Sequence, residues 1–255
     1  MRSSHITSQA APAPSAALSS LPPSPSSSRI LQAEETGRPE ASSTTSERPS
    51  SSVLDVASRF PWQRDPYEID PELVLHLMDL YFDRVNSVGY HIVPRGPFLH
   101  WLQAYRSKSL DDLMLIHTML MVASNFSSRP DRRLFTREFG RIARYAIDRR
   151  QGTWTLQLVQ SRFLLALQNV ISNQPTEAWD VCGGAIRAAV GLGLHLEGSK
   201  TAQDEDGSVL YGLSRHGFAE CKRLTFWALY LMDVRLLVFF FFSRSISGLR
   251  FRDQA

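Results

Sequence analysis

From Asp70 onward, apolar residues recur at separations of three and four positions, which is the spacing of one helix face. Signals that begin helices stand between these segments. Asp70-Pro71-Glu72 offers an N-cap carboxylate, a proline for the first helical position and an acid for the first turn. Ser109 and Asp112 form a capping-box pattern. There is no sustained apolar–polar alternation and no Asn-Gly hairpin signal, so no strand is predicted.

The repeated helix signals therefore predict an all-α fold class, with six or seven helices in one multi-helix domain. No internal repeat with a fixed period is found. The predicted helices begin near Asp70, near Phe98, after Ser109, at Pro130, at Thr155, at Pro175 and near Phe218.

The first 52 residues differ sharply in composition from the rest of the chain. They contain sixteen serines and seven prolines, and no Phe, Trp or Tyr occurs before Phe60. Such a segment buries too little apolar surface to offset the entropy of ordering. Residues 1–52 are therefore predicted to be a disordered Ser/Pro-rich tail, and residues 53–255 to be the helical domain. The prolines also argue against an amphipathic targeting helix in the tail.

Charge and cysteine content are only weakly informative about partners. The net charge of +3 permits an acidic partner without requiring one. Cys182 and Cys221 lie too far apart in sequence for a CxxC motif, so neither a disulfide framework nor a zinc finger is predicted. Residues 224–242 have the length of a membrane span, but Asp233 and Arg235 would each cost about 2.5–3.5 kcal/mol at the bilayer centre. A helix buried in protein is favoured, and no membrane partner is expected.

The segment AIRAAVGLGLHLEG, residues 185–198, raises the possibility of a phosphate-binding loop. A dinucleotide loop requires GxGxxG directly after a strand, whereas Gly191 and Gly193 follow an alanine-rich helical pattern. Close helix packing and a frayed C-terminal end are predicted instead. The small residues of this helix are Gly183, Gly184, Ala185, Ala188, Ala189 and Gly191.

Other patterns that carry chemistry are incomplete. His195 has no Cys, Asp or second His at ligand spacing. Asp111-Asp112 lacks the further acid, at Leu115, that a magnesium-binding helix face needs, so helix capping is predicted for both aspartates. No GxSxG motif is present. Catalytic, metal-binding and cofactor-binding residues are therefore not predicted.

Eight arginines lie between positions 129 and 150. Four of them share one helical face, which suggests a contact for an acidic protein or for nucleic acid. The alternative is a face that contacts only solvent, with its positive charge partly offset by three interspersed acidic residues. The shared face carries Arg133, Arg137, Arg141 and Arg144.

Two structural predictions concern the last helix. Phe226, Trp227 and Tyr230 are predicted to face the core, with Leu231, Val234 and Leu237 extending that stripe. Asp233 lies among apolar residues and is predicted to pair with a basic side chain of another helix.

Three segments, in order, carry a resemblance to a known family: LVLHLMDLYFDRVNSVGYHIVPRGPFLHWL, AWDVCGGAIRAAVGLGLHLE and ECKRLTFWALYLMD. Together they resemble the fungal-specific transcription factor domain, the middle homology region of fungal zinc-cluster regulators. The positions that match the family pattern are Tyr81, Phe82, Gly191, Leu192, Gly193, Leu194, His195, Glu220, Arg223, Phe226, Trp227 and Asp233.

The resemblance implies an all-helical nuclear domain that lies downstream of a DNA-binding zinc cluster, regulates activation and responds to metabolites. The six cysteines of that cluster are not in this sequence, so zinc binding and DNA reading are carried over to no residue here. After Asp233 the family usually shows Arg, small residues and Gly-Arg-Pro, whereas this chain has VRLLVFFFF. This departure predicts that the domain is incomplete at its C-terminal end.

The leading hypothesis is a non-enzymatic regulatory domain of a fungal transcription factor. Its expected partners are the transcription machinery or regulatory proteins, together with a small effector, while contact with DNA would be indirect or weak. One alternative is a stand-alone helical ligand-binding protein or an enzyme with an unrecognised site. Another is an unstable fragment in which residues 239–242 promote aggregation. Oligomeric state and the sign of regulation stay open.

Overall fold

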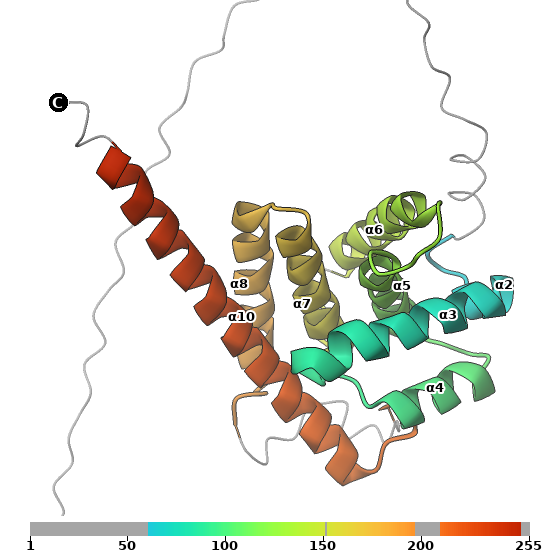
Figure 1. The fold of residues 1–255 in the computed structure, drawn as a ribbon. Helices are drawn as coiled ribbons and strands as arrows, with labels where there is room; N and C mark the ends of the chain where they lie inside the picture. The colour runs from blue at the N-terminus through green and yellow to red at the C-terminus, as the bar shows by residue number, and fades with distance from the viewer. Residues whose placement is uncertain (1–60, 151, 197–209, 251–255) are drawn as a thin grey trace, which may run out of the picture. The chain divides into compact units, whose positions relative to one another are not determined.

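A computed structural model describes residues 61–150, 152–196 and 210–250, with side chains described as far as Phe240. Within these ranges the chain forms eight α-helices, one π-helix and one 3-10 turn, and no strand (Figure 1). The all-α prediction is confirmed, whereas the predicted tail, residues 1–52, lies outside the described residues. The elements are α2 Pro66–Ile69, α3 Pro71–Tyr81, η1 Phe82–Tyr90, α4 Arg95–Ala104, α5 Leu110–Ser124, α6 Arg132–Arg149, α7 Leu156–Ile171, α8 Pro175–Gly191, η2 Leu210–Gly212 and α10 Arg215–Arg250.

The predicted helix starts depend on side-chain caps. The carboxylate of Asp70 accepts a hydrogen bond from the Leu73 N–H at 3.1 Å and begins α3. Ser109 and Asp112 cap each other's backbone N–H groups at the start of α5, at 3.2 and 3.0 Å. Thr155 accepts the Leu158 N–H at 3.2 Å and begins α7. These bonds satisfy donors that the first turn of a helix leaves unpaired.

Capping does not explain both aspartates of the Asp111-Asp112 pair, so that prediction is half wrong. Asp112 is the capping-box acid, but Asp111 forms a two-pronged ion pair with Arg150, at 2.6 and 2.8 Å. Asp111 is buried, and the pair ties the start of α5 to the end of α6. Spacing in the sequence could not reveal this, because the partner lies 39 residues away.

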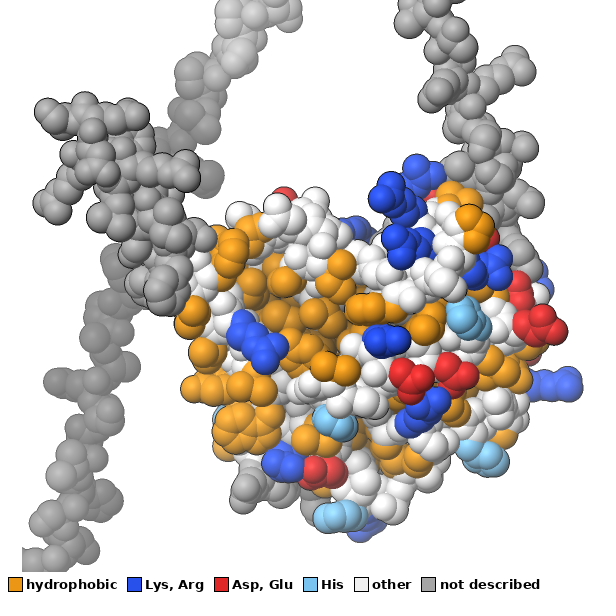
Figure 2. All heavy atoms as spheres, viewed as in Figure 1, with side chains coloured by type: hydrophobic (Ala, Val, Ile, Leu, Met, Phe, Trp, Pro, Cys, Tyr) orange, Lys and Arg blue, Asp and Glu red, His pale blue; other side chains and the backbone are white. Residues whose placement is uncertain are grey.

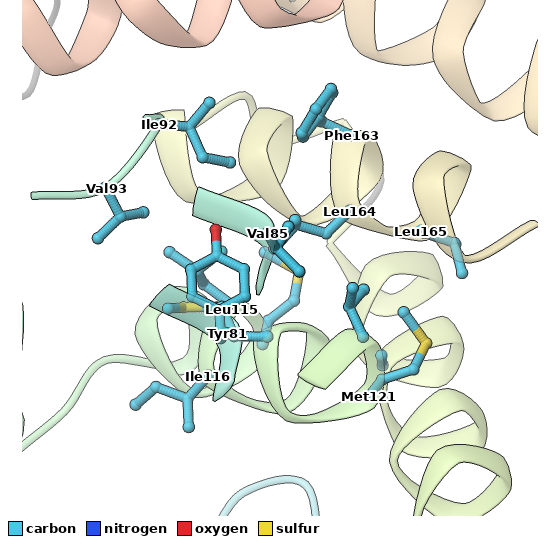
Figure 3. Packing of buried hydrophobic residues seen from close by; sticks show 14 of the residues in the cluster. Tyr81, Val85, Ile92, Val93, Leu115, Ile116, Met121, Phe163, Leu164 and Leu165 are labelled. Carbon is cyan, nitrogen blue, oxygen red and sulfur yellow. The ribbon is translucent and has the colours of Figure 1, made fainter. Parts of the chain in front are cut away.

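Helix α5 forms the centre of the domain and packs against α3, α6 and α7. Nearly every residue of α5 is buried, as expected for a helix that is apolar all round. Its buried hydroxyls are satisfied within the helix, since Thr118 donates to the Met114 carbonyl at 2.7 Å. Figure 3 shows Tyr81 and Val85 packed between α5 side chains such as Leu115 and α7 side chains such as Leu164.

Helices α7, α8 and α10 pack in succession beside this centre (Figure 1). Small residues of α8 allow the close approach, because Ala185, Ala188 and Ala189 are all buried. Gly183 and Gly184, predicted to serve the same purpose, instead lie beside the guanidinium groups of Arg187 and Arg162. Close packing is therefore confirmed for the alanines. At Gly184 the neighbouring helix α7 approaches through Arg162, which donates to the Gly184 carbonyl at 3.3 Å, whereas Gly183 meets only Arg187 of its own helix.

A buried polar network joins α7 and α10 to the segment that follows η1. The Gln160 amide donates to the Ile92 carbonyl at 2.8 Å and to the Thr225 hydroxyl at 3.1 Å. The Cys221 thiol donates to the same Ile92 carbonyl at 3.0 Å. Three segments far apart in the sequence are thus held together by hydrogen bonds in the core.

The predicted core face of the last helix is wrong. The face of α10 that packs inward carries smaller side chains, and we call it the inner stripe: Cys221, Thr225, Ala228, Leu229, Met232 and Leu236. The face predicted to be buried points to solvent, and each of its large side chains is between 37% and 51% exposed. We call this the outer stripe of α10: Trp227, Tyr230, Leu231, Val234, Leu237 and Val238.

The physical reason is that α10 is apolar on two opposite faces, and only one of them fits against α8. The inner stripe carries small side chains at Cys221, Thr225 and Ala228, which allow α10 to pack closely against α8, α7 and η1, whereas a row of aromatic rings would hold the helices apart. Phe226 is partly buried beside the core and conforms to the prediction. In the part of the chain that the structure describes, no helix has both the length and the apolar character needed to cross a membrane.

Candidate functional site

The arginine face of α6 is the most distinctive charged surface among the described residues. We define it as Arg133, Arg137, Arg141 and Arg144, all of which are exposed, while Phe135, Phe139 and Ile142 anchor the opposite face in the core. The prediction that the four arginines share one face of a helix is confirmed. Figure 2 shows Lys and Arg side chains gathered where α6 lies in Figure 1.

Two of these arginines are held by a buried carboxylate. Glu138 is 6% exposed and receives Arg141 Nε at 3.1 Å and Arg137 Nε at 3.5 Å. The guanidinium groups of Arg137 and Arg141 themselves remain about 60% exposed. Glu138 therefore orients two positive charges while contributing little negative surface of its own.

The other two arginines differ in whether another side chain holds the guanidinium group in place. Arg144 Nη2 donates to Asn169 Oδ1 on α7 at 2.9 Å, which fixes its guanidinium over the α6–α7 boundary. Arg133 makes no hydrogen bond or ion pair with any described residue. At the start of α6, Asp131 is occupied by Arg129, and this hydrogen bond lowers the pKa of Asp131. The face is thus positive, with Arg133 the side chain that is free to contact a partner.

The chemistry that this face favours is recognition of carboxylates or phosphates. Guanidinium groups bind both through paired N–H donors. No group of three or more His, Cys, Asp or Glu side chains that could hold a metal ion is found among the described residues. Two buried groups outside the ion pairs are held in their neutral forms, because burial lowers the pKa of His117 to about 3 and raises that of Cys221 to about 12.

The glycines at the end of α8 belong to an ordered helix cap. Gly193 has a φ of +69°, and its N–H donates to the Val190 carbonyl at 2.9 Å. The Leu194 N–H reaches back to the Ala189 carbonyl at 3.0 Å, and Leu194 is buried. This is a Schellman cap, which requires the left-handed backbone that glycine adopts readily. The predicted frayed end is therefore wrong.

Gly191 is required by a close contact that sequence reasoning missed. A Cβ atom at this position would lie 2.0 Å from a ring carbon of Trp154, which belongs to the segment between α6 and α7. Close packing was predicted here, but against a neighbouring helix and not against an indole ring. No sequence signal links Trp154 to Gly191, because the whole of α7 and most of α8 separate the two along the chain.

The remaining signature residues contribute mainly to packing. Tyr81 and Phe82 are fully buried, and their rings meet edge to face with centroids 5.2 Å apart. Leu192 caps α8 by donating its N–H to the Ala188 carbonyl at 2.9 Å. His195 is exposed, and its ring lies 6.1 Å from that of Phe226, which connects the end of α8 to α10.

Three of the signature residues of α10 are charged. Glu220 and Arg223 pair with each other, and Asp233 has no ion-pair partner among the described residues. Arg223 donates to both carboxylate oxygens of Glu220, at 2.6 and 2.8 Å, one helical turn away. This hydrogen bonding lowers the pKa of Glu220. Asp233 is half-buried and near Cys182, and it forms no ion pair with a side chain of the described residues. The predicted partner of Asp233 on another helix is therefore not found there.

Comparison with known proteins gives the family. Residues 78–244 match the Fungal specific transcription factor domain, and this region covers well over half of the chain. The chain belongs to this family. The matched region begins within α3 and ends within α10, and it overlaps all three segments of the resemblance.

Two curated relatives are regulators of transcription. The Zn(2)-C6 fungal-type transcription factor FTF1c of Fusarium oxysporum f. sp. lycopersici is 28% identical over 170 residues, which are 64% of this chain. The uncharacterized transcriptional regulatory protein C1327.01c of Schizosaccharomyces pombe is 28% identical over 180 residues, 65% of this chain. In both cases the match spans 17% of the relative's length. No solved structure matches this chain.

Proposed function

We propose that this chain is a nuclear regulatory domain that controls transcription by contacting an acidic surface of another protein through the arginine face of α6. Family membership supports a role in transcription regulation. The observation that carries the specific proposal is the set of four exposed guanidinium groups on one helix, two of them oriented by the buried Glu138.

A protein partner is favoured over DNA by the geometry of the face. The four arginines span Arg133 to Arg144, which is about three helical turns, or roughly 16 Å. Within this span two guanidinium groups are already engaged with Glu138 and one with Asn169. Few fully free charges remain for the many phosphate contacts on which DNA affinity depends. A short acidic segment needs only a few paired contacts.

The test is a reporter assay with the full chain fused to a heterologous DNA-binding domain. We expect the fusion to change reporter output relative to the DNA-binding domain alone. The double variant Arg133→Glu and Arg137→Glu should abolish this change, because it reverses two exposed charges and leaves the Arg141–Glu138 pair in place. Arg84→Glu, which reverses an exposed charge on η1, is the matched control and should behave as wild type.

Two results would contradict the proposal in different ways. Reporter output equal to that of the DNA-binding domain alone, under all growth conditions, would remove the regulatory role itself. A regulatory fusion that is unaffected by the α6 double variant would retain the role and exclude the arginine face. Binding to a mixed-sequence DNA duplex that is lost in the same variant would replace the protein partner with nucleic acid.

A further inference from the structure

The outer stripe of α10 is a row of large apolar side chains without a partner among the described residues. Its six large side chains are each 37–51% exposed, and Phe239 beyond them is 49% exposed. Figure 2 shows apolar side chains spread over the region where α10, α8 and α7 lie in Figure 1. Contiguous apolar surface of this kind on a helix marks an interaction site.

The stripe has the spacing of a helix that pairs with another helix. Trp227 and Val234 lie seven residues apart, with Tyr230 and Leu237 three residues after each of them. This is the a and d pattern of a heptad repeat. At about 100° per residue, the centre of the outer stripe lies roughly opposite the inner stripe that faces the core. A partner helix can therefore reach it without displacing the body of the domain.

We propose that the outer stripe binds the same stripe of a second copy of this chain, in a parallel two-fold dimer. The repeat makes the stripe self-complementary, because each copy offers the row of large side chains and the intervening holes that the other requires. The domain bodies would lie on the two outer sides of the helix pair, since each inner stripe points away from the interface.

The area available is sufficient for a dimer. Trp227 and Tyr230 are about half exposed and the four aliphatic side chains are 37–49% exposed, so together the stripe presents at most on the order of 500 Å². With the whole stripe covered in both copies, the pair would bury about 1,000 Å², which is the lower limit for a specific protein interface. The exposed Phe239 would add to this area.

Charges at the edges of the stripe select the parallel orientation. Asp233 lies on one edge and Arg235, which donates to the Tyr90 hydroxyl at 2.8 Å, lies on the other. Each is about 100° from the stripe centre. In a parallel two-fold pair, Asp233 lies on the same side as Arg235 of the second copy. In an antiparallel pair, like charges would lie on the same side, which is less favourable.

The experiment is sedimentation velocity on the full chain across a concentration series. We expect a species of twice the 28.8 kDa chain mass. The double variant Val234→Glu and Leu237→Glu should weaken association by more than about tenfold, because it buries charge in the interface. Val88→Glu is the control, since Val88 is an exposed apolar residue on η1 that does not belong to the stripe, and it should keep the dimer.

Helix content from circular dichroism and a cooperative thermal transition show whether each variant is folded. A second variant, Tyr230→Cys, tests the same contact without introducing charge. Cys182 and Cys221 are buried, so an engineered thiol at 230 is the accessible one. In the parallel dimer it faces its own symmetry mate and forms an interchain disulfide on mild oxidation.

Three results would overturn the inference. The first is a wild-type chain that sediments as a monomer throughout the series. The second is polydisperse association that Val88→Glu and the stripe variant alter equally. The third is a specific dimer in which Tyr230→Cys does not cross-link, which would exclude the parallel arrangement.

Discussion

Replacing Gly191 with alanine should force Trp154 out of its position. The new Cβ would lie 2.0 and 2.5 Å from two carbons of the indole ring, whereas ordinary contact begins at 3.4 Å. The ring must therefore move by more than 1 Å, given the difference between these distances. Trp154 is 52% exposed and lies on a connecting segment, so it can swing toward solvent without breaking a helix.

The cost is set by the packing that the ring loses. About half of the surface of Trp154 is covered, which at 150–250 Å² for the whole side chain and about 25 cal/mol per Å² corresponds to about 2–3 kcal/mol. Alanine is favoured over glycine in a helix by up to about 1 kcal/mol, and this offsets part of the loss. The expected net destabilisation from Gly191→Ala is about 1–2 kcal/mol.

A double-mutant cycle with Trp154→Ala isolates this contact. Free energies of unfolding would be measured by urea titration, with far-UV circular dichroism as the signal. In the Trp154→Ala background, Gly191→Ala has no ring to displace and should be neutral or stabilising by up to about 1 kcal/mol. Equal destabilisation in both backgrounds would refute the argument. Gly96→Ala in α4, where an added Cβ meets nothing within 4 Å, is the control.

Three further perturbations test other parts of the fold. Burial lowers the pKa of His117 to about 3, so only the unfolded chain gains its proton near pH 6.5. Stability should be greatest above pH 6.5 and fall by up to about 1.4 kcal/mol per pH unit between 6.5 and 3, as measured by urea titrations at several pH values. Asp111→Asn removes the buried charge that Arg150 holds and should cost about 1.5–3 kcal/mol in urea unfolding. Gly193→Ala, at a φ of +69°, should cost about 1–2 kcal/mol and lower the melting temperature.

Each of these has a distinguishing control. His117→Leu should flatten the acid limb of the pH profile, and an unchanged slope would place its origin elsewhere. Arg150→Ala in the Asp111→Asn background should cost less than in wild type, because the pair is already broken; additive losses would argue against coupling. Gly193→Asn should retain more stability than Gly193→Ala, since asparagine tolerates the left-handed region; equal losses would count against backbone strain.

Much of the fold follows from local sequence signals. Asp70, Ser109 and Thr155 each cap the helix that they precede, and the arginines of α6 share the predicted face. These features depend on residues within one or two helical turns, where backbone geometry determines which side chains are neighbours. The contact between Trp154 and Gly191, the ion pair between Asp111 and Arg150, and the Gln160 network each join residues far apart in the sequence. Local patterns therefore do not predict them.

The candidate site, too, could be predicted from the sequence only in part. The sequence identifies four basic side chains on one face, but it does not show that Glu138 is buried between two of them. It also does not show that Asn169, on another helix, fixes Arg144. Orientation of the guanidinium groups depends on these tertiary contacts, whereas their presence on one face depends only on helical spacing.

Helix α10 marks the limit of what sequence alone determines. The spacing of its apolar residues specified a helix with two apolar faces, but the larger aromatic face was the wrong choice for the core. Tertiary packing decided between them, because the small side chains of the inner stripe let α10 pack closely against α8, α7 and η1. Periodicity reports that a face can be buried; which face is buried depends on the shape of the neighbouring helix.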